Sequence, residues 1–166
     1  LFTADSKLEG ESTSVDISGL IGQYAHGNEP SHHIAHLYNY VGQPWRTQEI
    51  VDEVLHTLYF NNPDGLSGNE DCGQMSAWYI LNAMGFYQVC PGKPVYSIGR
   101  PLFNEATVHL KDGKSFKVIA HNNSRDNKYV QSIVLNGHKL ETPFFTHQDI
   151  VDGGTLELTM GSEPLK

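Results

Sequence analysis

The 166-residue sequence lacks several features that would place it in a common class. It has two cysteines, too few for a disulfide framework, and no C-x-x-C pair that would indicate zinc. No apolar run reaches the roughly 18–20 residues that a membrane span needs. The G-x-S-x-G elbow, the P-loop and the dinucleotide fingerprint are also missing. What remains is a globular domain that has no membrane span and none of these nucleophile or nucleotide motifs.

Basic residues are scarce in the first half of the chain. Residues 1–91 hold eleven Asp and Glu side chains against two basic residues, Lys7 and Arg46, whereas residues 92–166 hold eight acidic and nine basic residues. So acidic a half repels a phosphate backbone, and we expect no nucleic-acid partner. It suits a cation, a neutral polar substrate or a basic surface instead.

Helical patterning fills the first half and strand patterning the second. Apolar spacing predicts helices at about 31–42, 44–58 and 72–84, and no strand before residue 85. Alternation then predicts strands at about 107–110, 115–120, 129–135 and 155–160, with tight turns at 111–114 and 136–137. We therefore expect an α+β fold, with residues 1–91 helical and residues 92–166 forming a small antiparallel β-sandwich or jelly-roll.

The tripeptide Gly-Asn-Glu occurs twice, each time before a predicted helix. It stands at residues 27–29 and again at residues 68–70, where Asp71 follows. Helices joined by short connections pack antiparallel, so the first and third should begin at the same end. That gathers Glu29, Asp71 and their neighbours Asn28, Asn69 and Glu70 at one mouth. We expect the Glu29 and Asp71 carboxyl groups to lie about 6–12 Å apart.

Carboxylates around such a mouth support two kinds of chemistry. They can perform acid–base catalysis on a glycosidic bond, or they can hold calcium together with the asparagine oxygens. N-capping explains one polar residue per helix but not a repeated tripeptide, so we interpret the cluster as functional. Aromatic residues nearby either stack on sugar rings or pack in the core: Tyr24, Trp45, Trp78 and Phe86.

Four histidines crowd the same region. His32 and His36 are spaced as two ligands on one helical face, but the H-E-x-x-H zinc motif needs glutamate where His33 stands. We therefore expect histidines that support the cleft through hydrogen bonds. The two cysteines are expected to be free and buried, with one bridge between Cys72 and Cys90 as the alternative.

Long motifs in the first half resemble glycoside hydrolase family 92. They are His26-Gly-Asn-Glu-Pro-Ser-His-His-Ile34, Leu37-Tyr-Asn-Tyr40 with Gly42-Gln-Pro-Trp45, and Gly68-Asn-Glu-Asp-Cys-Gly-Gln-Met-Ser-Ala-Trp78 with Gly85-Phe-Tyr87. The resemblance covers essentially the whole chain. Members are calcium-dependent, inverting exo-α-mannosidases, here expected to act on α-1,2 linkages. It implies that residues 1–91 are the last part of an (α/α)6 barrel, that residues 92–166 are a C-terminal β module, and that an N-terminal part is missing.

The resemblance also implies roles for individual residues. Asp71 matches the general base that activates water, and Asn69 matches a partner position that is Asp in some members. Glu29 matches a substrate-binding carboxylate, with His26 and Asn28 beside it in the same motif. The family's proton donor lies in an upstream Glu-Gly-Asn-x-Trp motif, which this sequence does not contain.

The resemblance thus predicts the C-terminal portion of a bacterial periplasmic or extracellular enzyme that removes terminal α-linked mannose from glycans. Calcium is the implied cofactor, and Glu53 is similar in placement to a calcium-ligating glutamate. Because the proton donor is missing, we expect the isolated chain to be inactive. The alternative is a non-catalytic calcium- or carbohydrate-binding module that uses the same acidic mouth.

Overall fold

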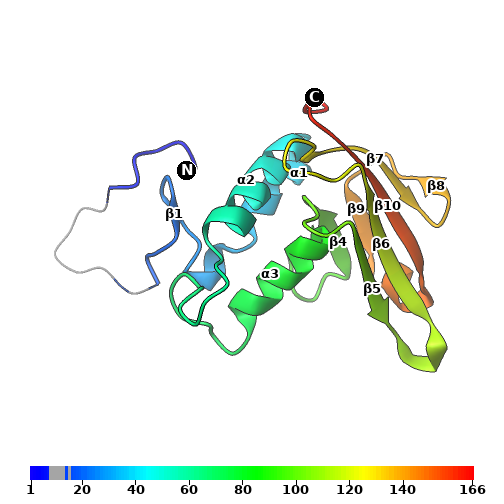
Figure 1. Cartoon of the computed structure of the whole chain (residues 1–166), viewed down its shortest axis with the longest axis horizontal. Helices are drawn as coiled ribbons and strands as arrows, with labels where there is room; N and C mark the ends of the chain where they lie inside the picture. Colours follow the sequence, from blue (N-terminus) through cyan, green and yellow to red (C-terminus); the bar gives the residue numbers. More distant parts are fainter. Residues whose placement is uncertain (8–13, 15) are drawn as a thin grey trace.

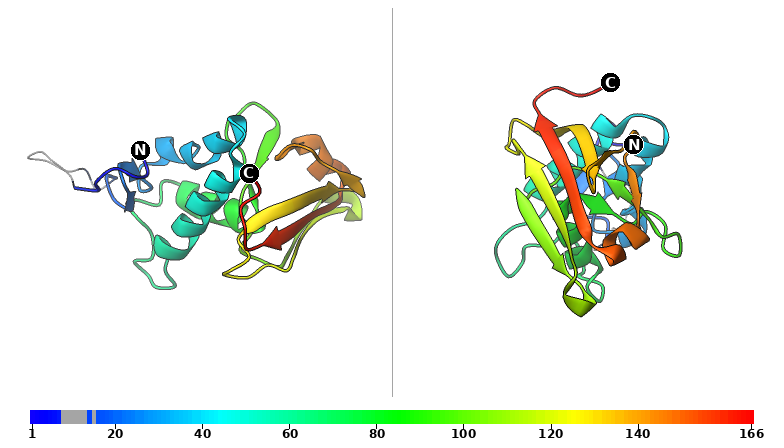
Figure 2. Two further views of the ribbon diagram at one scale, coloured as in Figure 1. Left: turned by 90° about the horizontal axis from the view of Figure 1, so that it is seen from above. Right: turned by 90° about the vertical axis from the view of Figure 1, so that its right-hand side faces the viewer.

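The computed structural model describes residues 1–7, 14 and 16–166. A helical part and a β part lie side by side along the longest axis of the molecule (Figures 1 and 2). The helical part comprises β1 (Leu20–Ile21), β2 (Tyr24–Ala25), η1 (Glu29–Ser31), η2 (Ile34–His36), α1 (Leu37–Tyr40), α2 (Pro44–Thr57) and α3 (Gln74–Met84). The β part comprises β3 (Phe86–Tyr87), β4 (Val95–Ile98), β5 (Glu105–His109), η3 (Lys111–Gly113), β6 (Ser115–His121), β7 (Tyr129–Leu135), β8 (His138–Lys139), β9 (Phe144–Thr146), α4 (His147–Asp152) and β10 (Gly154–Gly161).

The predicted second and third helices are confirmed as α2 and α3, which run in opposite directions (Figure 1). Pro44 opens α2, where its missing N–H costs nothing, and Gly85 ends α3 with φ +104°. The single helix predicted at 31–42 is wrong, because η1, η2 and α1 replace it. Local bonds compete with a regular helix there: the Ser31 hydroxyl donates to Ala25 O and the His32 ring bonds His26 O.

The β part departs from the predicted antiparallel arrangement at one pair of strands. The larger sheet has the order β5-β6-β10-β7-β8, in which β10 lies parallel to β6 and antiparallel to β7. The chain passes through β9 and α4 before it reaches β10, which lies between β6 and β7, two strands that precede it in the sequence. The direction of β10 follows from that crossover. The two predicted tight turns are present, with φ values of +60° and +72° at residues 112 and 113 and of +51° and +80° at residues 136 and 137. The expectation of no strand before residue 85 is wrong, since β1 and β2 form a short hairpin around Gly22.

The apolar core is divided between the two parts. In the helical part Val51, Val54 and Trp78 are completely buried. In the β part the smaller sheet, with the order β3-β4-β9, shares a core with the larger one. None of the helices in the described ranges is long and apolar enough to cross a membrane. The barrel, the jelly-roll and the division at residue 91 stay predictions.

Helix α2 joins the two parts through polar contacts along one face. Gln48 Oε1 accepts the Val130 N–H at 3.1 Å, and the Tyr129 hydroxyl donates to Glu49 Oε1 at 2.9 Å. One turn further along, the buried Asp52 Oδ1 lies 2.9 Å from Arg100 Nε. We call these contacts the α2 seam. They fix the helical part against β7 and against the segment that follows β4, so the mouth is built on a supported scaffold.

Candidate active site

The predicted meeting of the Gly-Asn-Glu loops is confirmed, and glycine makes it possible. Gly68 adopts φ +70°, and a Cβ on it would lie 2.9 Å from the carbonyl oxygen of Gly27. A Cβ on Gly27 would in turn lie 3.2 Å from the carbonyl oxygen of Ser67, which precedes Gly68. The backbones of the two loops can therefore touch only where side chains are missing. This contact brings Glu29 and Asp71 to one place.

Glu29 and Asp71 line a single cleft of about 490 Å³. Its walls come from η1, the start of α3, β3 and the loop that follows it. The lining residues are Glu29, Pro30, His32, His33, Asp71, Gln74, Tyr87, Gln88, Val89 and Pro91. We call this cleft the acidic mouth. The two acids that the sequence predicted to meet both line it.

The Glu29 and Asp71 carboxyl groups lie closer together than expected, within hydrogen-bond range rather than 6–12 Å apart. A hydrogen bond to Glu29 raises the pKa of Asp71, and desolvation and the charges of Glu29, Asp16 and Glu70 raise it further. The pKa of Glu29 is lowered, first by its own backbone N–H and then by the Asp71 hydrogen bond. As the pH falls, the pair therefore takes up its first proton on Asp71 rather than on Glu29.

The other members of the predicted cluster do not line the mouth. Glu70 accepts the backbone N–H groups of Gly73 and, at 3.3 Å, of Ser76. It therefore caps α3, and its pKa is lowered first by a hydrogen bond with the Ser76 side chain and further by these backbone bonds. Asn69 Nδ2 donates to Asp16 Oδ1 at 3.0 Å. Asn28 is exposed beside the mouth, and its carbonyl oxygen accepts from Ser31. Capping explains Glu70 but not Asp71.

His26 is wholly buried behind the mouth, so it does not present its ring to a substrate in this structure. The Tyr59 hydroxyl donates to Met75 O at 3.0 Å, so it accepts from His26 Nε2 at 2.7 Å. Tyr24 then donates to His26 Nδ1 at 2.9 Å. Burial is the first cause that lowers the pKa of His26 to about 3, and the ring stays neutral. Its ring stacks on His32 with centroids 4.7 Å apart and supports it from behind.

Gln74 and Tyr87 are site residues that the sequence interpretation missed. Gln74 Nε2 contacts His32 Nδ1 at 2.9 Å and the Tyr87 hydroxyl at 3.1 Å. Both residues lie inside the segments that carry the family resemblance, and Gln74 follows Asp71 by three positions on the first turn of α3. That spacing is the signal that could have found Gln74, whereas β3 brings Tyr87 in only through the tertiary fold.

The histidine spacing does not form a zinc site in the described residues. His36 bonds Asn82 Oδ1 at 2.8 Å and Ser97 Oγ at 3.1 Å, and burial lowers its pKa to about 4. His32 bonds a different set of partners, as expected for histidines that support a cleft. Cys72 and Cys90 are free, as expected, but both are exposed. The expectation of buried thiols is therefore wrong.

A calcium site is not assembled within residues 1–7, 14 and 16–166, where no group of three or more His, Cys, Asp or Glu side chains is placed to hold a metal ion. Calcium prefers about six to eight oxygen ligands. Glu53 is exposed on α2 and does not line the acidic mouth. The residues present therefore do not fit a complete calcium site, and the ligand role of Glu53 stays a prediction.

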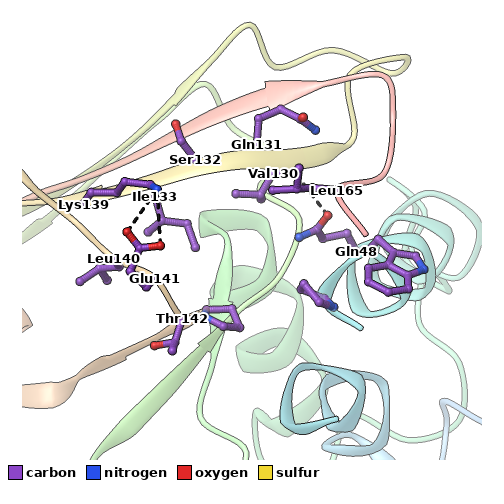
Figure 3. Close-up of a pocket in the computed structure, with 13 residues that line it drawn as sticks. Gln48, Val130, Gln131, Ser132, Ile133, Lys139, Leu140, Glu141, Thr142 and Leu165 are labelled. Carbon is purple, nitrogen blue, oxygen red and sulfur yellow. Dashed lines mark hydrogen bonds and ion pairs between the residues drawn. The ribbon is translucent and has the colours of Figure 1, made fainter. Parts of the chain in front are cut away.

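A second cavity, of about 170 Å³, lies between the start of α2 and strands β7 and β8 (Figure 3). Gln48 points into it and is bonded to the Val130 N–H, while Lys139 and Glu141 pair at 3.2 Å. Trp45 is the one of the four suggested stacking aromatics that lines this cavity, since Tyr24, Trp78 and Phe86 are buried. The acidic residue of this second cavity, Glu141, is paired with Lys139. The acidic mouth is therefore the better candidate for acid–base chemistry.

Known proteins resemble this chain over most of its length. The family model of the glycosyl hydrolase family 92 catalytic domain matches residues 1–162. An uncharacterized secreted glycosidase from Arthroderma benhamiae is 32% identical over 140 residues, which are 82% of this chain and 18% of that protein.

Solved structures agree. A family GH92 α-mannosidase from Bacteroides thetaiotaomicron, in complex with mannoimidazole, is 44% identical with a TM-score of 0.91 over 99% of this chain and 21% of that one. An inverting family GH92 mannosidase from the same organism is 49% identical with a TM-score of 0.80 over 86% of this chain and 19% of that one. The chain spans about a fifth of the length of these relatives. It belongs to glycosyl hydrolase family 92.

Proposed function

We propose that the protein containing this chain is an inverting exo-α-mannosidase, and that the chain is its C-terminal portion and carries the water-activating side of the active site. The observation that carries the proposal is the Glu29–Asp71 pair in the acidic mouth of a family 92 chain. The relatives support it, since they are described as α-mannosidases and, for one, as inverting.

The closeness of the two carboxyl groups restricts what they do. An inverting glycosidase needs a general acid and a general base about 6.5–9.5 Å apart, with water and the glycosidic bond between them. Glu29 and Asp71 lie within hydrogen-bond range, so they cannot stand on opposite sides of that bond. We therefore assign both to one side. The proton donor then comes from the part of the protein beyond this chain.

Within the pair, the pKa shifts suggest separate roles. The raised pKa makes Asp71, once it is ionised, the stronger base toward a water molecule. The lowered pKa keeps Glu29 ionised, so that it can accept hydrogen bonds from sugar hydroxyls. Asn69 holds Asp16 near Asp71, and His26 supports His32. Asn28, at the exposed rim, is left with a substrate-binding role on the resemblance alone.

The finer features of the activity are part of the proposal. We infer α-1,2-linked mannose on glycans as the substrate, and a periplasmic or extracellular location. The relative described as a secreted glycosidase supports export. Calcium assistance is proposed for the whole enzyme, with most oxygen ligands supplied from outside the described residues. The steps assigned above to Asp71 and Glu29 do not depend on it.

The test is Asp71→Asn in the full-length protein, which removes the base but keeps the size of the side chain. We expect kcat on an aryl α-mannoside to fall by about 10²–10⁴, the usual contribution of general base catalysis. Asp64→Asn is the matched control, because Asp64 is exposed on the loop between α2 and α3 and away from the mouth. Full turnover by Asp71→Asn would remove the assignment, and Glu29 would be the next residue to test.

A further inference from the structure

We propose that Gln74 and Tyr87 form a hydroxyl-binding pair that orients a sugar in the acidic mouth, with Gln74 Oε1 as acceptor and the Tyr87 hydroxyl as donor. His32 acts as the positioning residue that fixes this polarity. The inference rests on the proposed function and deepens it, because it names residues that bind the sugar hydroxyls beside the Glu29–Asp71 pair.

The polarity follows from a chain of hydrogen bonds that begins at a backbone carbonyl. His32 Nε2 lies 2.9 Å from the carbonyl oxygen of His26, which can only accept, so Nε2 carries the proton. In the neutral ring Nδ1 is then an acceptor, and the group facing it at 2.9 Å must be the amide nitrogen of Gln74. This orientation assigns the Gln74 oxygen and nitrogen from bonding alone.

The second amide hydrogen of Gln74 carries the polarity onward to Tyr87. Gln74 Nε2 donates to the Tyr87 hydroxyl oxygen at 3.1 Å, so the Tyr87 proton is left to donate elsewhere. Within the described residues neither that proton nor Gln74 Oε1 has a protein partner. Both side chains line the acidic mouth, where a ligand can supply the missing partners.

The pair is held rigidly from behind. The Trp78 indole N–H donates to His32 O at 3.0 Å, and Trp78 is completely buried. The Tyr87 ring centroid lies 5.5 Å from that of His36 and 6.3 Å from that of Trp78. Burial raises the pKa of Tyr87 and lowers that of His32, so both keep the neutral forms that this polarity needs. Preorganised groups of this kind bind a ligand at low entropic cost.

An adjacent acceptor and donor suit a particular chemistry. A sugar hydroxyl both donates and accepts, so neighbouring hydroxyls of one pyranose ring can satisfy Gln74 and Tyr87 together. A charged ligand would satisfy one group and not the other. The ligand class is therefore a neutral pyranose with adjacent hydroxyls, held while Asp71 faces the reacting carbon.

The test uses the full-length protein and the variants Tyr87→Phe and Gln74→Glu. We expect Tyr87→Phe to raise KM for an aryl α-mannoside about three- to tenfold with kcat nearly unchanged, the effect of one lost neutral hydrogen bond in binding. Mannoimidazole binding, measured by calorimetry, should weaken by the same factor. Gln74→Glu cannot donate to His32 or Tyr87, so it should weaken binding further. Tyr79→Phe is the matched control, because Tyr79 packs on Tyr59 away from the mouth.

The outcomes separate this inference from the proposed function. A wild type that hydrolyses mannosides, with variants that leave KM and mannoimidazole affinity unchanged, would overturn the pair alone. A wild type that binds another pyranose in a Tyr87-dependent manner without hydrolysing mannosides would support the pair and overturn the proposed function. If Tyr87→Phe lowers kcat and the unfolding temperature without changing affinity, Tyr87 is structural and the inference is wrong.

Discussion

Two aspartates of the helical part show how surroundings divide one residue type into two roles. Asp52, in the α2 seam, is buried and faces Arg100 at 2.9 Å and His56 at 3.2 Å. Asp71, in the acidic mouth, is exposed and faces Glu29, with Glu70 and Asp16 nearby. Asp52 is paired with the buried cation Arg100, whereas acidic neighbours raise the pKa of Asp71. The first arrangement stabilises the fold, and the second provides a base.

The largest effect expected from this comparison concerns the mouth as a half-site. The isolated 166-residue chain should show no turnover of an aryl α-mannoside with millimolar calcium, because a base without an acid cannot complete an inverting reaction. The full-length protein under the same conditions is the control. Turnover by the isolated chain that disappears in Asp71→Asn would contradict the half-site and make Glu29 a candidate acid.

The next effect concerns the α2 seam. Asp52→Asn should destabilise the protein by about 3–5 kcal/mol, because Arg100 is left buried without its charged partner. Urea unfolding followed by tryptophan fluorescence measures it, since Trp78 lies in the adjoining core. The control is again Asp64→Asn, because Asp64 is exposed. Asp149→Asn is unsuitable, because Asp149 caps α4. A loss below about 1 kcal/mol would show that the pair contributes no more than a surface ion pair.

A smaller effect tests the glycine contact that builds the mouth. Gly68→Ala should cost about 1–3 kcal/mol, from the left-handed backbone and from the close approach to Gly27. Gly42→Ala is the matched control, because Gly42 also has a positive φ of +72° but a Cβ on it would meet nothing within 4 Å. Both variants should lose stability, and Gly68→Ala should in addition lower kcat/KM. Equal kcat/KM values would mean that the loops need no direct contact.

The smallest effect is a shift along the pH axis. Asp71 acts as a base only when it is ionised, so kcat/KM should fall as the pH drops through its raised pKa. Glu29→Gln removes the charge and changes the hydrogen bond that raise this pKa. The acidic limb of the profile should therefore move to lower pH, whatever happens to its height. Glu141→Gln, at the second cavity, should leave the limb in place, and an unmoved limb in Glu29→Gln would show that the two carboxyl groups do not share a proton.

Much of the fold could be predicted because local signals agreed with the tertiary structure. Pro44 and Gly85 marked helix ends, and the turns at 111–114 and 136–137 carried their own backbone preference. The prediction of a single helix at 31–42 was wrong because side chains in this segment bond to the neighbouring loop, which competes with a regular helix. The parallel pairing of β6 and β10 was not predicted because strand alternation indicates which face is buried and not which strand is the partner.

By itself the sequence determined which residues could meet: a repeated Gly-Asn-Glu, with glycines small enough for two backbones to touch and acids beside them. Tertiary structure decided what each acid does. It turned Glu70 toward the start of α3, brought Asp71 against Glu29, and set Gln74 and Tyr87 beside them. The physical reason is that a carboxyl group's proton affinity depends on burial, charge and hydrogen bonds within a few ångströms. Those neighbours come from segments far apart in the chain, which only the fold brings together.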